Sequence, residues 1–520
     1  MKFSIHYGSR EIEETFGDGF RLGEEFCWGT GNSAYQAEGG LNGPGEPLNN
    51  WAPWERSGKA APTGMATGFY HRYREDFQNA RRIGLNHFRL GLEWARIQPC
   101  AKMESPSPPD FDPEALEHYA RVLATARELD LEPAVTLHHF THPMWMGADM
   151  WLDGDNLELF EEYVRYVVTG INELLIERYR QEPIGMWETT NEPNILAPSF
   201  YLAGAFPSGG TGIGRYGRAL NNLLLAHLAA YENIHRIYRE RGWTRPVVTL
   251  ATVSFCFYWL DKVIFDILLA RKRGVSRDEL PQYLDERATR FHGMAEGIPR
   301  PPGPGFKAGL YVEKAIRRGL GHMIKASRFS PVIERIYSSG LEQHLDLIAI
   351  DFYDPFPGHY IKLPDLEEIR RGRPRFYVQH WDWIQNPPAF RAFLKAYSQE
   401  NDGVPVHVFE HGLCNRVKNG RPIPRKDGAD RPAFLKAFLF EMARAIKEGA
   451  PVEGYFHWSI TDNYEWGSFE PRFGLHGIDY ENGAKRSRLD SSGRDAAGAF
   501  RGIIESMTSG SLEEIKKALL

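Results

Sequence analysis

Cysteine is scarce in this chain. The four cysteines, Cys27, Cys100, Cys256 and Cys414, are widely separated along 520 residues, and no two of them have the short spacing of a zinc site. Small secreted domains held together by disulfides carry many more cysteines in far fewer residues. The scarcity argues against a disulfide framework and predicts a protein of a reducing compartment.

Long hydrophobic runs are also absent. The most apolar stretch, Ala251 to Leu260, is broken at Asp261 and Lys262, and it is too short to span a bilayer. The first residues, Met1 to Glu14, contain no apolar segment of the secretory type. We therefore expect a cytoplasmic protein.

A large charge of one sign and the usual cofactor motifs are missing as well. The formal net charge is -6, which gives no reason to expect nucleic acid as a partner. No histidine cluster has metal-ligand spacing, and no glycine-rich phosphate loop follows a predicted strand. The sequence therefore predicts neither a metal site nor an organic cofactor, and it leaves the oligomeric state open.

Aromatic residues, by contrast, are abundant. They make up 13% of the chain and include 13 tryptophans. Most of them must fill the core, but an excess of tryptophan also suits a cleft that stacks flat-faced ligands such as sugars.

Apolar, strand-like runs recur eight times, each followed by a longer segment of helical periodicity. The strands are predicted at Phe26–Thr30, Asn86–Leu92, Glu132–His138, Ile184–Thr190, Val247–Ser254, Leu345–Phe352, Val404–Phe409 and Glu453–Trp458, and helices at Ala115–Leu129, Leu157–Arg178, Tyr216–Arg239 and Ala433–Glu448. Such alternation is typical of an α/β protein with a parallel sheet. We predict a single (β/α)8 TIM barrel spanning residues 1–520.

The connection between the fifth and sixth strands, residues 260–341, is unusually long. Within it, Lys307 to Arg335 carries seven basic and two acidic residues interleaved with apolar ones. A basic amphipathic segment of this kind can be a solvated helix packed on the barrel, cover a cleft, or rest on an anionic membrane surface. We expect an insertion over or beside the active-site face, with peripheral membrane or lipid contact through 307–335 as one role.

Polar residues stand where several of these strands end. Glu192 ends the fourth strand within Thr190-Asn-Glu-Pro-Asn194, and Glu410 ends the seventh. Because active sites of such barrels lie at the C-terminal ends of the strands, the two carboxylates are expected to face each other across the barrel mouth. Pro193 predicts extended rather than helical backbone at Glu192.

Two facing carboxylates suit the hydrolysis of a glycosidic bond. One carboxyl must hold a proton for the leaving oxygen, while the other must stay ionised at the anomeric carbon. Arg89 and the Tyr353 hydroxyl are expected to favour the charged form of Glu410. A more apolar setting would keep Glu192 protonated.

These residues resemble the glycoside hydrolases of family 1, the β-glucosidase and β-galactosidase type, from about Phe26 to Ile503. Five motifs carry the resemblance: Phe26–Gly39, Thr136–Pro143, Thr190–Asn194, Val406–Gly412 and Trp458–Gly474. The resemblance implies Glu192 as the acid/base and Glu410 as the nucleophile. It also implies sugar contacts by Gln36, His139, Asn191, Trp458, Glu465, Trp466 and Phe473.

The sequence departs from the family pattern at two supporting positions. Asp351 stands where the family usually has asparagine in Asn-Tyr-Tyr, and His411 follows Glu410 where the family usually has asparagine. An additional carboxyl and a titratable imidazole can shift the pKa values of the catalytic pair, so an unusual pH profile is expected.

We therefore predict a retaining β-glycosidase, β-glucosidase-like, that hydrolyses terminal β-linked glucosides, galactosides or fucosides. Glu465 would repel a phosphate on the sugar, which argues against a 6-phospho-glycosidase. A transglycosidase, or a hydrolase of glycolipids held by the insertion, is the alternative. A sugar-binding protein without turnover is a third hypothesis, against which the presence of both glutamates speaks.

Overall fold

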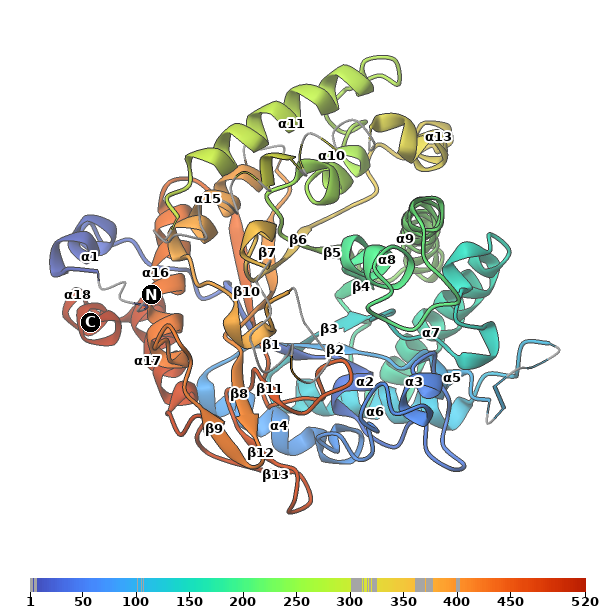
Figure 1. Cartoon of the computed structure of the whole chain (residues 1–520), viewed down its shortest axis with the longest axis horizontal. Helices are drawn as coiled ribbons and strands as arrows, with labels where there is room; N and C mark the ends of the chain where they lie inside the picture. The colour runs from blue at the N-terminus through green and yellow to red at the C-terminus, as the bar shows by residue number, and fades with distance from the viewer. Residues whose placement is uncertain are drawn as a thin grey trace.

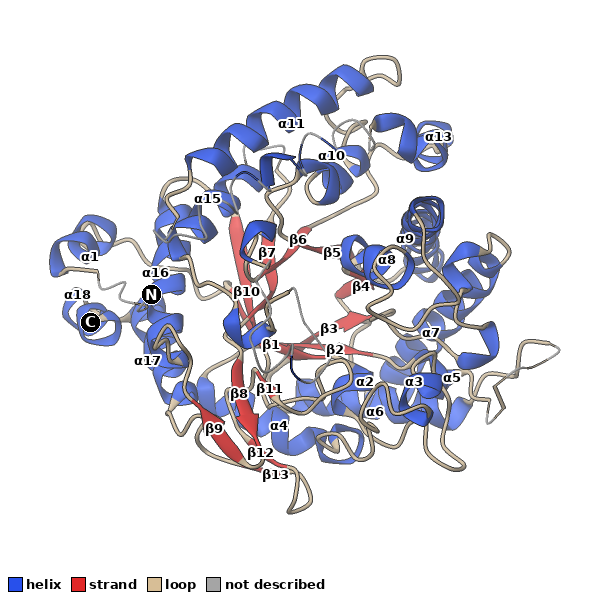
Figure 2. Cartoon of the chain, in the orientation of Figure 1, coloured by secondary structure: helices blue, strands red, loops and turns tan. Residues whose placement is uncertain are grey.

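A closed barrel of eight parallel strands forms the centre of the molecule (Figure 2). The computed structural model describes residues 3, 7–100, 102–103, 105, 107–300, 311, 313–315, 317, 319, 325–360, 370, 377–398 and 403–520. The barrel strands are β1 (Cys27–Asn32), β2 (His87–Gly91), β3 (Glu132–Thr136), β4 (Met186–Asn191), β5 (Val247–Val253), β6 (Ile348–Phe352), β7 (Val406–His411) and β10 (Val452–Trp458). Pairing of β1 with both β2 and β10 closes the ring, so the predicted barrel is confirmed.

Helices surround the barrel and bury its outer face (Figures 1 and 2). The larger ones are α4 (Phe69–Ile83), α6 (Pro113–Glu128), α7 (Asn156–Tyr179), α9 (Ile213–Arg241), α15 (Pro387–Tyr397), α16 (Arg431–Lys447) and α17 (Ala496–Ser509). The four predicted helices correspond to α6, α7, α9 and α16. Capping explains where α6 begins, because the Asp112 side chain accepts hydrogen bonds from the backbone N–H groups of Glu114 and Ala115.

Shorter elements complete the loops at the barrel mouth. The helices there are α2 (Ala34–Ala37), α3 (Ala52–Arg56), α5 (Trp94–Ile97) and α8 (Pro193–Tyr201), and the small strands are β8 (Asn415–Lys418), β9 (Arg421–Ile423), β11 (Pro471–Arg472), β12 (Ile478–Asp479) and β13 (Lys485–Arg486). Strand β8 pairs with both β9 and β11, so the segment after β7 is tied to the segment after β10.

Apolar side chains pack against both faces of the barrel strands. Inside the barrel, Ala134, Ala251, Ala349, Phe409 and Phe456 pack against one another below the mouth. A larger core lies between the strands and the surrounding helices. The inner layer closes the barrel from below, so polar chemistry is confined to the C-terminal ends of the strands.

The described part of the insertion packs against the outer helices. It contains α10 (Val263–Leu268), α11 (Leu280–Gly297) and α13 (Ser330–Ser338), which lie beside α15 and α9 (Figure 1). Asp266 on α10, fully buried, pairs with Lys262, Arg273 and Arg287. Residues 301–310, 312, 316, 318 and 320–324 lie outside the described residues, so the expected lipid contact through 307–335 stays a prediction.

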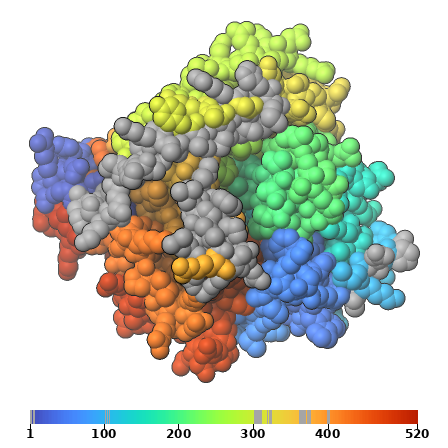
Figure 3. Space-filling model, viewed as in Figure 1, coloured from blue at the N-terminus to red at the C-terminus, as the bar shows by residue number. Residues whose placement is uncertain are grey.

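The two ends of the chain lie side by side. Helix α1 (Ser9–Phe16) contacts α18 (Leu512–Leu519), and Lys516 forms an ion pair with Glu13 at 2.7 Å (Figure 1). The space-filling view likewise shows blue N-terminal and red C-terminal surfaces in contact (Figure 3). In the described part of the chain, no helix is both long and apolar enough to cross a membrane.

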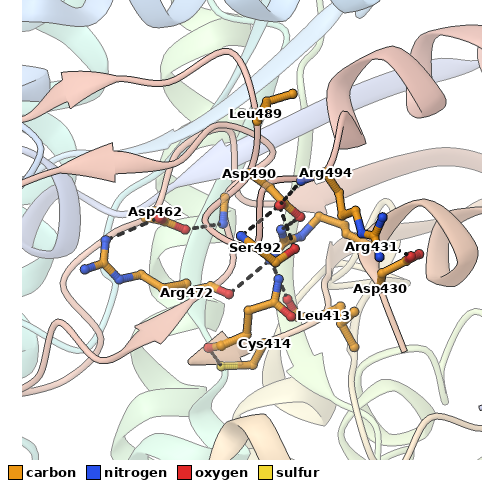
Figure 4. Close-up of polar contacts among 12 residues, drawn as sticks. Leu413, Cys414, Asp430, Arg431, Asp462, Arg472, Leu489, Asp490, Ser492 and Arg494 are labelled. Carbon is orange, nitrogen blue, oxygen red and sulfur yellow. Dashed lines mark hydrogen bonds and ion pairs between the residues drawn. The ribbon is translucent and has the colours of Figure 1, made fainter. Parts of the chain in front are cut away.

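A buried ion-pair network holds the loops after β7 and β10 together (Figure 4). Arg431, at the start of α16, pairs with Asp490 at 2.5 Å and donates to the backbone oxygens of Leu413 and Arg472. Asp462 accepts hydrogen bonds from the Arg472 guanidinium and from the backbone N–H groups of Gly474 and Ile478. The network therefore fixes the loop that carries Phe473.

Candidate active site

A cavity of about 540 Å³ opens at the C-terminal ends of the barrel strands. Ten of the predicted site residues line it: Gln36, His139, Asn191, Glu192, Tyr353, Glu410, Trp458, Glu465, Trp466 and Phe473. Residues from separate motifs thus meet in one place, as the barrel geometry predicts.

Arg89 on β2 organises the floor of this cavity. Its guanidinium donates two hydrogen bonds to Glu188, of 2.7 and 2.9 Å, one of 2.6 Å to Glu410 and one of 2.7 Å to the Asn191 side-chain oxygen. Arg89 is fully buried. A single cation therefore orients residues from β4 and β7 and neutralises part of their charge.

Glu192 lies at the junction between β4 and α8, where its backbone adopts the left-handed conformation with φ 45° and ψ 56°. The prediction of extended backbone at this residue is wrong. Pro193 does keep Glu192 out of the right-handed helical region, but it occupies the first position of α8, for which proline is well suited. The left-handed turn directs the carboxyl into the cavity between the strand and the helix.

An irregularity in the pairing of β6 and β7 decides which side chain of β7 faces the cavity. Ile350 pairs with Val408, but Asp351 pairs with Glu410, so one residue of β7 is skipped. Phe409 packs inside the barrel, and strict alternation would therefore send Glu410 outward. The bulge instead turns Glu410 into the cavity.

The same bulge turns His411 away from the site. Its ring stacks on Phe390 at 4.8 Å and its Nδ1 lies 2.9 Å from the Tyr455 hydroxyl, between the barrel and α16. Burial lowers the pKa of His411 well below its usual value. The structure therefore does not bring His411 to Glu192 and Glu410, and the expected titratable imidazole beside this pair is not found there.

Asp351, in contrast, lies against the pair. Oxygen atoms of Glu192, Asp351 and Glu410 all lie within 4.8 Å of one another. Asp351 is fully buried, and no N–H or hydroxyl group donates a hydrogen bond to either of its carboxylate oxygens. Burial, followed by the charges of Glu410 and Glu192, raises the pKa of Asp351 well above its usual value.

The surroundings of the two glutamates differ. Glu410 accepts hydrogen bonds from Arg89 and, at 3.0 Å, from the Tyr353 hydroxyl. Burial raises the pKa of Glu410, and these two donors oppose the rise. Burial and the charge of Glu410 raise the pKa of Glu192 well above its usual value. These surroundings therefore favour the ionised form of Glu410 and the protonated form of Glu192.

A second set of polar side chains, Gln36, Asn463 and Glu465, forms one side wall of the cavity. The Gln36 amide on α2 donates to Glu465 at 2.9 Å, and the Asn463 amide donates to the same carboxylate oxygen at 3.2 Å. Burial raises the pKa of Glu465 to about 8. Asn463 was not singled out in the sequence, although its position two residues before Glu465 is the signal that could have found it.

Aromatic rings complete this part of the cavity. The His139 ring lies nearly parallel to Trp458 and Trp466, with ring centres 5.8 and 6.0 Å away. Phe473 lies 6.0 Å from Tyr353, edge to face. Burial, and then the charge of Arg89, lowers the pKa of His139 well below its usual value, so a neutral imidazole faces the cavity.

Two groups of residues at the site were not predicted from the sequence. Glu188, which holds Arg89, lies two residues after Met186 on β4, and period-two alternation could have placed it inside the barrel. The outer part of the cavity is lined by residues from α8 and the loop after it, from the end of β5 and the turn after it, and from the loop after β6: Ile195, Phe206, Val253, Phe255, Tyr360 and Val378. We call these six residues the apolar vestibule. They share no motif, and the sequence gives no signal for them.

A second cavity, of about 700 Å³, lies at the opposite end of the barrel, where β3 and β4 begin. Its lining includes Arg127 and Glu132, which neutralise each other in an ion pair of 2.6 Å. The described lining contains no pair of carboxylates held close together on facing strands. The cavity at the C-terminal end is therefore the candidate active site.

The only group of side chains in the described part of the chain that is close enough to share a metal ion is Glu192, Asp351 and Glu410. Arg89 already supplies a positive charge to Glu410 at 2.6 Å. The expectation of no metal and no organic cofactor stays a prediction.

Comparisons with known proteins agree with this geometry. The sequence pattern described as "Glycosyl hydrolase family 1" matches residues 19–273 and 341–495. Beta-glucosidase A of Thermotoga maritima is 26% identical over 483 residues, covering 90% of this chain and 95% of that protein. The 6-phospho-beta-galactosidase 1 of Streptococcus pneumoniae is 27% identical over 484 residues, covering 88% of this chain and 94% of that protein.

Solved structures show the same fold. A beta-glucosidase from Thermotoga maritima in complex with galacto-hydroximolactam aligns with a TM-score of 0.67 and 20% identity, covering 94% of this chain and 99% of that chain. A beta-glycosidase from Pyrococcus horikoshii aligns with a TM-score of 0.63 and 22% identity, covering 96% of this chain and 98% of that chain. From the extent of the sequence match, the chain belongs to glycosyl hydrolase family 1.

Proposed function

We propose that this chain is a retaining β-glycosidase that removes an unphosphorylated terminal β-linked sugar, with Glu410 as nucleophile and Glu192 as acid/base. The observation that carries the proposal is the pair itself: their carboxylate oxygens approach within 4.8 Å in unlike surroundings. In retaining glycosidases the two carboxyls stand about 5–5.5 Å apart, whereas inverting enzymes leave about 6.5–9.5 Å for a water molecule.

The reaction proceeds in two displacements. A Glu410 oxygen attacks the anomeric carbon while the bond to the aglycone oxygen breaks, and Glu192 gives its proton to that oxygen. Water then attacks the glycosyl ester, Glu192 takes a proton from the water, and the Glu410 carboxylate is released. Tyr353 and Arg89 hold the Glu410 carboxylate in place for the attack.

The cavity favours an unmodified sugar over a 6-phosphate. No lysine or arginine occurs among the described residues that line it, so within that lining a phosphate would have no cation to pair with. Gln36, Asn463 and Glu465 instead offer two amides and a carboxyl for sugar hydroxyls. Glucosides, galactosides and fucosides are the candidate substrates.

The proposal is tested with p-nitrophenyl β-glucoside, β-galactoside and β-fucoside. The unmodified protein is expected to hydrolyse at least one of them, and Glu410→Ala to lose activity. Added azide should restore turnover of Glu410→Ala with an α-glycosyl azide as product, whereas Glu192→Ala with azide should give the β-glycosyl azide. The same azide anomer from both variants would contradict the assignment of roles.

Hydrolysis by the unmodified protein is also the measurement that separates an enzyme from a sugar-binding protein. Tight binding of a sugar without release of p-nitrophenol from any of the three glycosides, and without turnover of a glycolipid, would overturn the proposed function.

A further inference from the structure

A buried carboxylate on β4, Glu188, holds the cation that contacts the proposed nucleophile. Glu188 accepts hydrogen bonds from Arg89 Nε at 2.7 Å, from Arg89 Nη2 at 2.9 Å and from the Thr136 hydroxyl on β3. Arg89 and Glu188 are both buried, and Glu188 is not among the described residues that line the cavity. Glu188 can therefore affect the reaction only through its neighbours.

An irregularity in β4 brings two side chains of this strand to the same guanidinium. In the pairing with β5, Glu188 lies opposite Thr249 and Asn191 opposite Ala251, so three steps along β4 match two along β5. Strict alternation would turn two side chains that are three residues apart to opposite faces of the sheet. With the bulge, Glu188 and Asn191 both accept a hydrogen bond from Arg89 Nη2.

The Arg89 guanidinium is thus shared between two carboxylates. Nε and Nη2 bind Glu188, whereas Nη1 binds Glu410 at 2.6 Å. The Phe409 ring covers the guanidinium, with its centre 5.4 Å from the guanidinium carbon. Because a guanidinium is planar and rigid, holding its Nε and Nη2 edge also fixes the direction of Nη1. The pairing with Glu188 therefore aims the remaining edge of Arg89 at Glu410.

Sharing also limits how strongly the cation stabilises the ionised form of Glu410. Burial raises the pKa of Glu410, Arg89 opposes the rise, and the charge of Glu188 adds to it. The other titratable groups around this cluster come from the ends of β3, β4, β6 and β10: His139, Glu192, Asp351, Tyr353 and Glu465. Glu188 differs from these groups because it is joined to Glu410 through the same guanidinium.

We propose that Glu188 is a positioning residue for the nucleophile, which aims Arg89 at Glu410 and withholds part of the charge of the cation from it. This inference rests on the proposed function, because it gives Glu188 a part in the attack by Glu410. A carboxylate that has a cation to itself is a weaker nucleophile, and one without a cation takes up a proton more readily. Glu188 keeps Glu410 between these two extremes.

The test is the pH profile of kcat/KM for p-nitrophenyl β-glucoside, or for the β-galactoside or β-fucoside if one of these is the better substrate. Activity requires ionised Glu410, so the acid limb follows the pKa of Glu410. Glu188→Gln keeps the size of the side chain but removes its charge, which leaves Arg89 to Glu410. The acid limb should therefore move down by about one pH unit. We also expect kcat to fall about tenfold or more, because the attack is weaker and less well aligned.

Glu188→Asp separates charge from reach. It keeps the carboxylate but is too short to hold both nitrogens of Arg89 in the same place. This variant should lower kcat while its acid limb stays close to that of the unmodified protein. A shift in Glu188→Asp as large as that expected for Glu188→Gln would overturn the inference, even if Glu188→Gln did not fold.

Asp76 on α4 offers a matched control. It is fully buried and accepts two hydrogen bonds from the Arg486 guanidinium, at 2.8 and 2.7 Å, but neither residue is among the described lining of the cavity. Asp76→Asn should lower the temperature of unfolding and leave the acid limb unchanged. An equal shift of the limb in Asp76→Asn and Glu188→Gln would show that the loss of any buried pair changes the profile, and the role of Glu188 would fall.

The same measurements separate this inference from the proposed function. If the unmodified protein hydrolyses none of the three glycosides, the proposed function fails and the role of Glu188 fails with it. If the unmodified protein hydrolyses one of them and Glu188→Gln keeps the same acid limb, only the role of Glu188 fails.

Discussion

Asp351 gives this site a third carboxyl beside the catalytic pair. The groups that face it are Glu192 and Glu188 from β4, Glu410 from β7 and Arg89 from β2. Arg89 is bonded to Glu188 and Glu410, which leaves Asp351 and Glu192 without a cation of their own. We propose that these two carboxyls share a proton, since two adjacent carboxylates cannot both ionise readily.

The first prediction follows from that shared proton. Activity requires Glu192 to be protonated, so it is lost as pH rises through the pKa of Glu192. Asp351→Asn removes the neighbouring negative charge and should lower that pKa, moving the alkaline limb of kcat/KM down by roughly one pH unit. The measurement is a pH profile with an aryl glycoside.

His411→Asn is the control for this prediction. Because His411 faces α16 rather than the pair, the variant should leave the alkaline limb where it is in the unmodified protein. A shift in His411→Asn as large as that in Asp351→Asn would contradict the role given to Asp351.

Glu410 and His411 also show where residue-level prediction stops. The motifs predicted that Glu410 faces the cavity, and the structure places it there. The direction of the His411 side chain depends on the bulge in β7, where one residue is skipped in the pairing with β6. Nothing in the composition of either strand reveals that bulge. The left-handed backbone of Glu192 escaped prediction for the same reason, because it depends on the start of α8 rather than on a local preference.

The strands themselves were predictable from sequence because parallel strands buried on both faces appear as nearly continuous apolar runs. The predicted segment Val247–Ser254, for example, differs from β5 by one residue. The loops were not predictable in this way. The vestibule draws on α8 and the loop after it, on β5 and the turn after it, and on the loop after β6, whose apolar residues look like ordinary core residues until the fold brings them together.

Contact between the ends of β7 and β10 yields the second prediction. A Cβ at Gly412, directly after β7, would lie 2.0 Å from the Trp458 backbone oxygen. Gly412→Ala must therefore push the two strand ends apart, and displacement of Glu410 should lower kcat/KM about tenfold or more. Steady-state kinetics with an aryl glycoside will measure the loss.

Gly502→Ala is a matched control for that substitution. Gly502 lies within α17 and has no atom within 4 Å of where its Cβ would be. Alanine there should leave the kinetics unchanged and stabilise the protein by about 0.5–1 kcal/mol, because glycine is less favourable than alanine inside a helix.

The third prediction concerns the buried network of Figure 4. Arg431→Ala leaves Asp490 without its counter-ion in the interior and should lower the free energy of unfolding by about 3–5 kcal/mol, as measured by thermal or urea denaturation. The Arg494 side chain is 61% exposed. Arg494→Ala should therefore change the free energy of unfolding by no more than about 0.5 kcal/mol. Equal effects of the two substitutions would show that the network is not a source of stability.

At the scale of the whole molecule, the two termini stabilise each other. Ile515 is fully buried and Leu519 nearly so, and α18 packs against α1, α16 and α17. The fourth prediction is that removal of residues 511–520 lowers the free energy of unfolding by about 3 kcal/mol or more. The kinetic constants at 25 °C should not change, because none of these helices contributes a residue to the described lining of the cavity.

The ion pair between Lys516 and Glu13 is the comparison for this truncation. Lys516→Ala removes a surface pair in which the Glu13 side chain is half exposed, and it should change the unfolding transition little. If Lys516→Ala destabilises the protein as much as the truncation does, the apolar contacts of α18 are not the cause.

The closure of the barrel between β1 and β10 has a consequence during synthesis of the chain. Glu192 and Glu410 are both made before β10, but Trp458, Glu465, Trp466 and Phe473, which wall the part of the cavity proposed to hold the sugar, come from β10 and the loop after it. A nascent chain therefore contains both proposed catalytic glutamates before it has the side chains proposed to hold a sugar. Affinity for the sugar will arise only when the last strand enters the ring, so a bound sugar analogue would report that a newly made molecule has finished folding.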